Sequence, residues 1–209
     1  MIHFCTAPNT EHFKKGNHIR LRCRNQHDVY YLKKGIIKII NLCATGKEII
    51  KYIVNEGEIF GLLGLTEGEN INDYAVAIED VIVCPIDAAT LKKMMNDNPN
   101  LNNYIFTLAG ERIKKLEQNL ESLVNKNAQT RIKDFILDYI KNFGTVSDDY
   151  VIAKNLLSNR DIGKLTSTSR QTVNKTLNTL KLNKIIDFDE KIMRASVKTL
   201  EKNTLENVS

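Results

Sequence analysis

The stretch that decides the fold is Asp161–Ile186, "DIGKLTSTSRQTVNKTLNTLKLNKII", in which two amphipathic helical patterns lie on either side of a short polar turn. A helix-turn-helix needs a small residue in its first helix, a tight turn, and apolar residues that join the two helices. Gly163 and the turn around Ser167 meet the first two requirements. The apolar residues that meet the third are Ile162, Leu165, Val173, Leu177 and Leu180. The stretch therefore predicts a helix-turn-helix.

The polar residues of the second helix indicate DNA as the partner. Ser169 is a predicted N-cap, so Arg170 and Gln171 fall on the first turn and Lys175 lies one turn further on. The first turns of a recognition helix reach base edges in the major groove, while the preceding helix crosses the phosphate backbone. Arginine pairs with guanine and glutamine with adenine, whereas lysine takes a guanine or a phosphate. We therefore expect base contacts from these three side chains. Candidates for the phosphate backbone are Ser158, Arg160, Thr168, Ser169, Thr172 and Asn174.

The flanking sequence supports a winged helix with a basic surface. Between Ser158 and Lys184, basic residues outnumber the single acid, Asp161. After the second helix, "KIIDFDEKIMRASV" gives two short β-type runs around the acidic turn Asp187–Glu190. Such a strand pair is typical of a wing. The chain is +5 in net charge, and its basic residues gather near the C-terminus.

The first half of the chain has the pattern of an all-β domain. Short runs rich in β-branched residues, such as "GIIKIINL", "EIIKYIV" and "VIVCPI", alternate with turn signals about ten residues apart. Ile19, Leu21 and Cys23 alternate with arginines, as a half-buried strand does. We expect a sandwich or barrel over residues 12 to 88. The turn signals are Gly16-Asn17, Asn25-Gln26, Lys34-Gly35, Thr45-Gly46, Glu56-Gly57 and Glu67-Gly68.

A long amphipathic helix is predicted from Asn98 to Lys126, opened by Pro99. Its apolar stripe is heptad-like, with one interruption around Arg112 and Ile113. A helix of this length extends beyond a small barrel, which favours pairing with a second copy over packing within one domain. The apolar stripe of this long helix consists of Leu101, Ile105, Leu108, Leu116, Leu120 and Leu123. A third segment begins at Asn127, a predicted N-cap.

Composition argues against several other classes. The N-terminus has neither a signal-peptide pattern nor an apolar run long enough to span a membrane, which predicts a cytoplasmic protein with no membrane partner. The 4 cysteines lack a C-x-x-C pair, so we expect reduced thiols and no iron-sulfur cluster. A metal-dependent β-barrel enzyme needs histidines on several strands, but all 4 histidines fall within the first 27 residues. We expect no enzyme activity, metal or cofactor. A dimeric scaffold that does not bind DNA is the other alternative.

The chain resembles the cyclic-AMP receptor protein / fumarate-nitrate reductase regulator (CRP/FNR) superfamily of bacterial transcription factors. The resemblance rests on "YYLKKGIIKI", "GEIFGLLGL", the helix after "NPNL", the pair Arg131-Ile132 and "DIGKLTSTSRQTVNKTLNTL". It implies an α+β chain with a double-stranded β-helix (β-roll) sensor at 1–97, a dimerisation helix at 98–126 and a winged helix-turn-helix DNA-binding domain at 127–209. It also implies a homodimer that binds palindromic double-stranded DNA and contacts RNA polymerase. The expected dimer interface is Leu101, Ile105, Leu108, Arg112, Leu116, Leu120 and Leu123.

The chain departs from this family where cyclic nucleotides are bound. Leu62 stands where nucleotide-binding members carry a ribose-binding Glu, and no Arg for the phosphate occurs within Asn70–Tyr74. The whole stretch from Tyr52 to Leu91 lacks Lys and Arg and would repel a phosphate. We therefore predict that neither cyclic AMP nor cyclic GMP is the effector. Another small ligand, a redox signal, haem or no effector remain as alternatives. The effector-pocket candidates are Gly61, Leu62, Leu63, Gly64, Asn72, Leu116 and Glu117.

Overall fold

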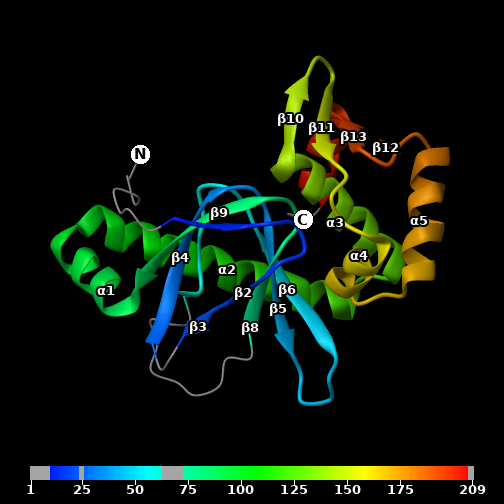
Figure 1. The fold of residues 1–209 in the computed structure, drawn as a ribbon. Helices are drawn as coiled ribbons and strands as arrows, with labels where there is room; N and C mark the ends of the chain where they lie inside the picture. The colour runs from blue at the N-terminus through cyan, green and yellow to red at the C-terminus, as the bar shows by residue number, and fades with distance from the viewer. Residues whose placement is uncertain (1–9, 24–25, 63–72, 207–209) are drawn as a thin grey trace. The chain divides into compact units, whose positions relative to one another are not determined.

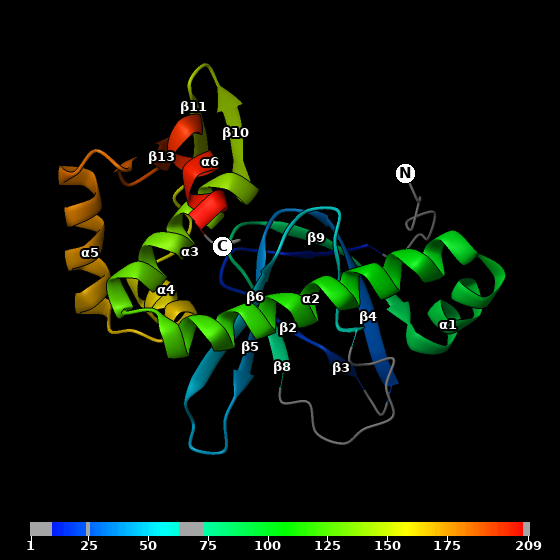
Figure 2. The same ribbon diagram turned by 180° about the vertical axis from the view of Figure 1, so that it is seen from behind.

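The structure is a computed structural model that describes residues 10–23, 26–62 and 73–206. The chain forms two compact units, residues 1–118 and 119–209 (Figures 1 and 2). Among the helices of the described residues, none combines the length and apolarity that a bilayer-spanning segment requires.

The first unit is a roll of two antiparallel sheets, as the turn spacing predicts. One sheet has the order β1 (Glu11–Phe13), β9 (Val81–Asp87), β4 (Gln26–Lys34) and β3 (Arg22–Cys23), with β7 (Ile59–Phe60) also paired to β4. The other has the order β2 (His18–Arg20), β8 (Asp73–Ala77), β5 (Ile37–Leu42) and β6 (Glu48–Val54). Every strand pair that the structure describes is antiparallel. The two sheets enclose one apolar core, in which Tyr30 and Phe60 stack at 5.1 Å between ring centroids.

Four of the predicted turns contain a glycine with positive φ, namely Gly16, Gly35, Gly46 and Gly57. The turn signals at Asn25 and Glu67-Gly68 lie outside the described residues. The single strand predicted through Ile19, Leu21 and Cys23 is divided in two. β2 pairs with β8 in one sheet and β3 pairs with β4 in the other, because the chain crosses between the sheets at Leu21. Leu21 packs against the core at this crossing.

Two helices follow the roll. The first, α1 (Ala88–Asp97), was not predicted from the sequence, and its N-cap Asp87 accepts a hydrogen bond from Thr90 N at 2.9 Å. The second, α2 (Pro99–Asn125), is the predicted long helix and has 27 residues. Its first turns pack on the roll, where Leu101 and Ile105 are buried with Val29 and Ile59.

The long helix α2 has two apolar faces rather than one interrupted stripe. Leu101, Ile105 and Leu108 pack against the roll. Arg112, which continues the same face, donates hydrogen bonds to the Tyr52 hydroxyl at 2.9 Å and to the Ile59 carbonyl at 2.6 Å. Leu101, Ile105, Leu108 and Arg112 were expected at a dimer interface, but they are engaged within their own unit.

A second, exposed apolar face of α2 follows an uninterrupted heptad. Phe106, Leu116 and Leu120 are 66%, 59% and 65% exposed. Ile113, which the sequence pattern assigns to an interruption, belongs to this face. Spacings of three and four residues run through the whole set, as in a coiled-coil seam. The face consists of Phe106, Ala109, Ile113, Leu116, Leu120 and Leu123.

The second unit is a helical domain with a small sheet. Its helices are α3 (Ala128–Phe143), α4 (Asn159–Thr166), α5 (Arg170–Leu182) and α6 (Val197–Glu206). Its sheet has the order β10 (Gly144–Ser147), β11 (Tyr150–Lys154), β13 (Ile192–Ser196) and β12 (Asp187–Phe188). The wing strands β12 and β13 were predicted, whereas β10, β11 and α6 were not. Ile132, Ile136 and Ile140 of α3 are buried in the core of this domain.

Candidate nucleic-acid interface

The predicted helix-turn-helix is formed by α4 and α5. The Ser158 hydroxyl caps α4 by accepting a hydrogen bond from Asp161 N at 3.1 Å. The helix ends at Thr166, and the Thr168 N–H donates to the Gly163 carbonyl at 2.8 Å. A Cβ at residue 163 would lie 2.9 Å from the Thr168 carbonyl oxygen. Glycine is therefore required there for the turn to fold back on the helix.

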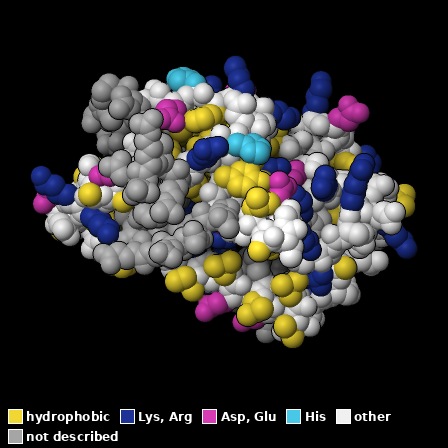
Figure 3. Space-filling model, turned by 60° about the horizontal axis from the view of Figure 1, so that its bottom comes forward, with side chains coloured by type: hydrophobic (Ala, Val, Ile, Leu, Met, Phe, Trp, Pro, Cys, Tyr) yellow, Lys and Arg dark blue, Asp and Glu magenta, His cyan; other side chains and the backbone are white. Residues whose placement is uncertain are grey.

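Helix α5 has one buried and one exposed face. The Ser169 hydroxyl caps it, accepting from Thr172 N at 3.0 Å. The buried face consists of Val173, Thr176, Leu177 and Leu180, with Ile162 of α4 buried in the same core. The side chains predicted to contact bases, Arg170, Gln171 and Lys175, are all exposed on the other face. Figure 3 shows basic side chains, in dark blue, over the right of the view, where α4 and α5 lie. The exposed face of α5 is therefore polar and basic at its first turns.

The side chains predicted to contact phosphates differ in their exposure and in their hydrogen bonds within the chain. Arg160 and Asn174 are exposed. The hydroxyls of Ser158 and Ser169 serve as helix caps, and Thr172 Oγ1 lies 2.9 Å from Ser169 Oγ. Thr168 is partly buried, with its Oγ1 at 2.9 Å from Thr166 Oγ1. These hydroxyls order the backbone N–H groups at the helix start, which is itself an anion-binding position.

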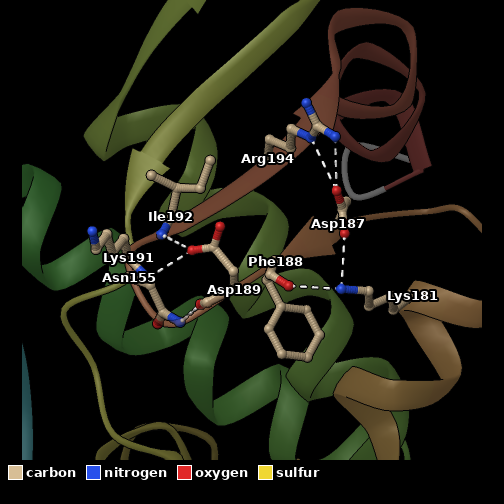
Figure 4. Close-up of polar contacts among 8 residues, drawn as sticks. All are labelled: Asn155, Lys181, Asp187, Phe188, Asp189, Lys191, Ile192 and Arg194. Atoms are coloured by element: carbon tan, nitrogen blue, oxygen red, sulfur yellow. Dashed lines mark hydrogen bonds and ion pairs between the residues drawn. The ribbon is translucent and has the colours of Figure 1, made fainter.

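The first acid of the wing turn, Asp187, is paired with two cations (Figure 4). Asp187 lies 2.8 Å from Arg194 Nη2 and 3.0 Å from Lys181 Nζ. Hydrogen bonds from these two cations hold the pKa of the Asp187 carboxyl below its ordinary value. Lys181 also donates to the Phe188 carbonyl at 2.8 Å. Lys181 is one of the basic residues between Ser158 and Lys184 that were expected to form a basic surface, but in the structure it stabilises the wing.

The tip of the wing is a hydrogen-bonded turn. The Asp189 carboxylate accepts hydrogen bonds from Lys191 N at 2.7 Å and Ile192 N at 2.9 Å. Hydrogen bonds from these two backbone N–H groups lower the pKa of Asp189. The Asn155 amide donates to the Asp189 carbonyl at 2.6 Å, which fastens the tip to the domain (Figure 4). Glu190 and Lys191 are exposed at this tip.

The effector-pocket candidates that the structure describes lie in different surroundings. Leu62 packs against the apolar cluster that contains Leu101 and Ile105. Leu116 and Glu117 are exposed on α2, and Leu63, Gly64 and Asn72 lie outside the described residues. Gly61 has a φ of 80°. The candidates thus do not gather into one site among the described residues.

A polar cluster that was not predicted lies in the roll. The Asp73 side chain is 4% exposed and lies 2.7 Å from Lys51 Nζ. Asn41 donates to the same carboxylate at 2.7 Å. Burial raises the pKa of the Tyr52 hydroxyl, which the guanidinium of Arg112 partly opposes. Asp73 and Tyr52 are therefore held in place by the chain's own cations.

Of the two cysteines whose side chains the structure describes, one differs from expectation. Cys84, which is buried on β9, is disulfide-bonded, whereas Cys43 is a free thiol. The prediction that all four cysteines are reduced is therefore wrong for Cys84. Within the described ranges, no group of three or more His, Cys, Asp or Glu side chains could hold a metal ion.

Ser167 offers a test of the turn before α5. It has φ 52° and ψ 49°, a left-handed conformation that costs a non-glycine residue about 1–2 kcal/mol. Its side chain is exposed. We expect Ser167→Gly to raise the free energy of unfolding by about 0.5–1 kcal/mol in urea denaturation, because the relieved strain of about 1–2 kcal/mol exceeds the entropy that a glycine adds to the unfolded chain. Ser167→Ala, which removes the hydroxyl but keeps the Cβ, is the control and should change it little. A destabilised Ser167→Gly protein would contradict the left-handed assignment.

The chain is similar to known proteins in both sequence and fold. A cyclic nucleotide-binding domain profile matches residues 10–98. The global nitrogen regulator of Synechococcus elongatus is 27% identical over 87% of this chain and 82% of its own length. A CRP-like cAMP-activated global transcriptional regulator of Mycobacterium tuberculosis is 24% identical over 71% of this chain and 66% of its own. The structure of FixK2 from Bradyrhizobium japonicum superposes with a TM-score of 0.77 at 20% identity, covering 93% of this chain and 96% of that one.

Proposed function

We propose that the chain is a member of the CRP/FNR superfamily of transcription regulators and that it binds DNA sequence-specifically as a homodimer. The observation that carries this proposal is the exposure of Arg170, Gln171 and Lys175 on the first turns of a capped, well-packed α5. The names of its relatives also favour a regulator over an enzyme.

The base contacts follow from side-chain chemistry. Arg170 can donate two hydrogen bonds to a guanine, and Gln171 can pair in the same way with an adenine. Lys175, one turn on, reaches a guanine or a phosphate. Many members of the family carry Glu at the position of Gln171, and a Glu there would accept from cytosine. We therefore expect adenine, rather than cytosine, at the base pair that Gln171 contacts.

The exposed apolar face of α2 supports dimerisation with a second copy of the chain. Leucines as exposed as Leu116 and Leu120 lose contact with water when two such helices pair. The heptad spacing of the face is that of a two-stranded coiled coil. Two-fold symmetry then implies a palindromic site with half-sites one or two helical turns apart. We expect such a dimer to be cytoplasmic and to contact RNA polymerase.

A cyclic nucleotide is disfavoured as the effector. The buried Asp73 carboxylate lies on the same face of β8 as Ala75 and Ala77, which line the core of the roll. An acid there, already paired with Lys51, opposes a ligand phosphate and leaves that lysine engaged. The alternative modes of control are an unidentified small ligand, a redox signal and haem.

The test is selection of bound duplexes from a random library by the ligand-free protein at a stated salt concentration, because phosphate contacts make affinity depend on salt. We expect one palindrome to be enriched, with a guanine and an adenine in each half-site, and the same palindrome when cyclic AMP is added. Binding that is blind to sequence with and without cyclic AMP would contradict a ligand-free regulator. No binding at all would favour a dimeric scaffold.

A further inference from the structure

Arg131 of α3 joins two helix ends through its guanidinium group. Nη1 donates to the Lys126 carbonyl at 2.8 Å, Nε to the Thr166 carbonyl at 3.0 Å, and Nη2 to the Ser167 carbonyl at 3.2 Å. Lys126 directly follows the last residue of α2, whereas Thr166 ends α4 and Ser167 is its C-cap. The last carbonyls of a helix have no partner within it, so one side chain satisfies such groups at two helices.

The acceptors suit an arginine in both charge and shape. A helix C-terminus carries partial negative charge, which a cation stabilises. The guanidinium is planar and holds its donors in a fixed fork, so it also fixes the positions of its acceptors relative to one another. A lysine at residue 131 would keep the charge, but its single nitrogen could not reach both helix ends in this way.

The end of α2 is held by further contacts from α3. Lys126 Nζ lies 2.7 Å from Asp134 Oδ2. The next residue, Asn127, caps α3 by accepting from Thr130 N at 2.9 Å. On the other side, the turn that Arg131 holds leads directly into Ser169 and the first turn of α5. A displacement at the end of α2 would therefore reach the turn through the guanidinium.

We infer that Arg131 is a positioning residue for DNA recognition, which fixes the direction in which α5 presents Arg170 and Gln171 and links that direction to the end of α2. This inference rests on the proposed DNA-binding function. Arg131 itself is partly buried and is engaged with backbone carbonyls, so it is not assigned a contact with DNA.

The test compares Arg131→Lys with the wild-type chain in two measurements. In the free protein, amide hydrogen exchange of Thr168, whose N–H is bonded to Gly163, should become about tenfold faster, the size expected from one lost hydrogen bond. Exchange in the middle of α3 should not change. Affinity for the selected palindrome should fall about tenfold, while affinity for random duplex and its salt slope stay the same because the charge is kept.

Arg20→Lys is the matched control, since Arg20 is an exposed arginine of the roll and has no part in the proposed DNA interface. It should change neither measurement. Unchanged Thr168 exchange and unchanged palindrome affinity in Arg131→Lys would overturn the inference. So would an equal rise of exchange throughout the domain, which indicates a purely structural role. If the wild-type chain itself does not discriminate between sequences, the proposed function fails, and the exchange of Thr168 still decides whether Arg131 holds the turn.

Discussion

Arg170→Ala is expected to lower the affinity of the protein for its palindrome by about 2–6 kcal/mol, because each of two half-sites loses a bidentate contact worth about 1–3 kcal/mol. The free energy of unfolding should hardly change, since Arg170 is exposed on the first turn of α5. The measurement is fluorescence anisotropy with the selected duplex and with a duplex in which the contacted guanine is replaced.

Lys202→Ala is the control for the lost charge. Lys202 is exposed on α6, so its removal lowers the net charge equally without touching the exposed face of α5. Arg170→Ala should also bind the two duplexes with nearly equal affinity. If it still discriminated between them as the wild-type chain does, Arg170 would not read that base.

The second large effect is expected at the exposed face of α2. Replacing both Leu116 and Leu120 by Glu places charges in the seam of a coiled coil, where desolvation and mutual repulsion oppose pairing. The helix itself should persist, because both positions are exposed and Glu is a good helix former. We expect the protein to become monomeric in sedimentation velocity experiments and to lose its high affinity for the palindrome.

Val146→Glu is the matched control, because Val146 is 68% exposed but lies on β10 rather than on α2. It should leave the oligomeric state unchanged. A Leu116→Glu, Leu120→Glu double variant that still sedimented as a dimer would show that the protein pairs through another surface.

Features that depend on neighbouring residues could be predicted from the sequence. The caps Asn127 and Ser169, the requirement for Gly163 and the turn at Ser167 are short-range, and the structure confirms each of them. The boundaries of the long helix are also confirmed to within about one residue at each end.

Features that depend on what packs against an element were harder to predict. The sequence pattern of α2 predicts one stripe, but Ile105 faces the roll while Phe106 faces outward, so adjacent residues serve different partners. The hairpin β10–β11 was missed because most of β10 is exposed, so its sequence carries little of the apolar alternation of a half-buried strand. Its signal was the turn at Asp148, whose φ of 52° Asp tolerates better than most residues. The contacts of Arg131 join segments far apart in the chain, so the Arg131-Ile132 pair gave no indication of them.

The most direct test of sequence reading by α5 is a repeated selection from a random duplex library, with Gln171→Glu in place of the wild-type chain. Glu accepts a hydrogen bond from cytosine N4, whereas Gln pairs with adenine. We predict that adenine is replaced by cytosine at one symmetric pair of positions and that the rest of the palindrome is unchanged. Enrichment of the same palindrome by both proteins would contradict the claim that the first turn of α5 reads the DNA sequence.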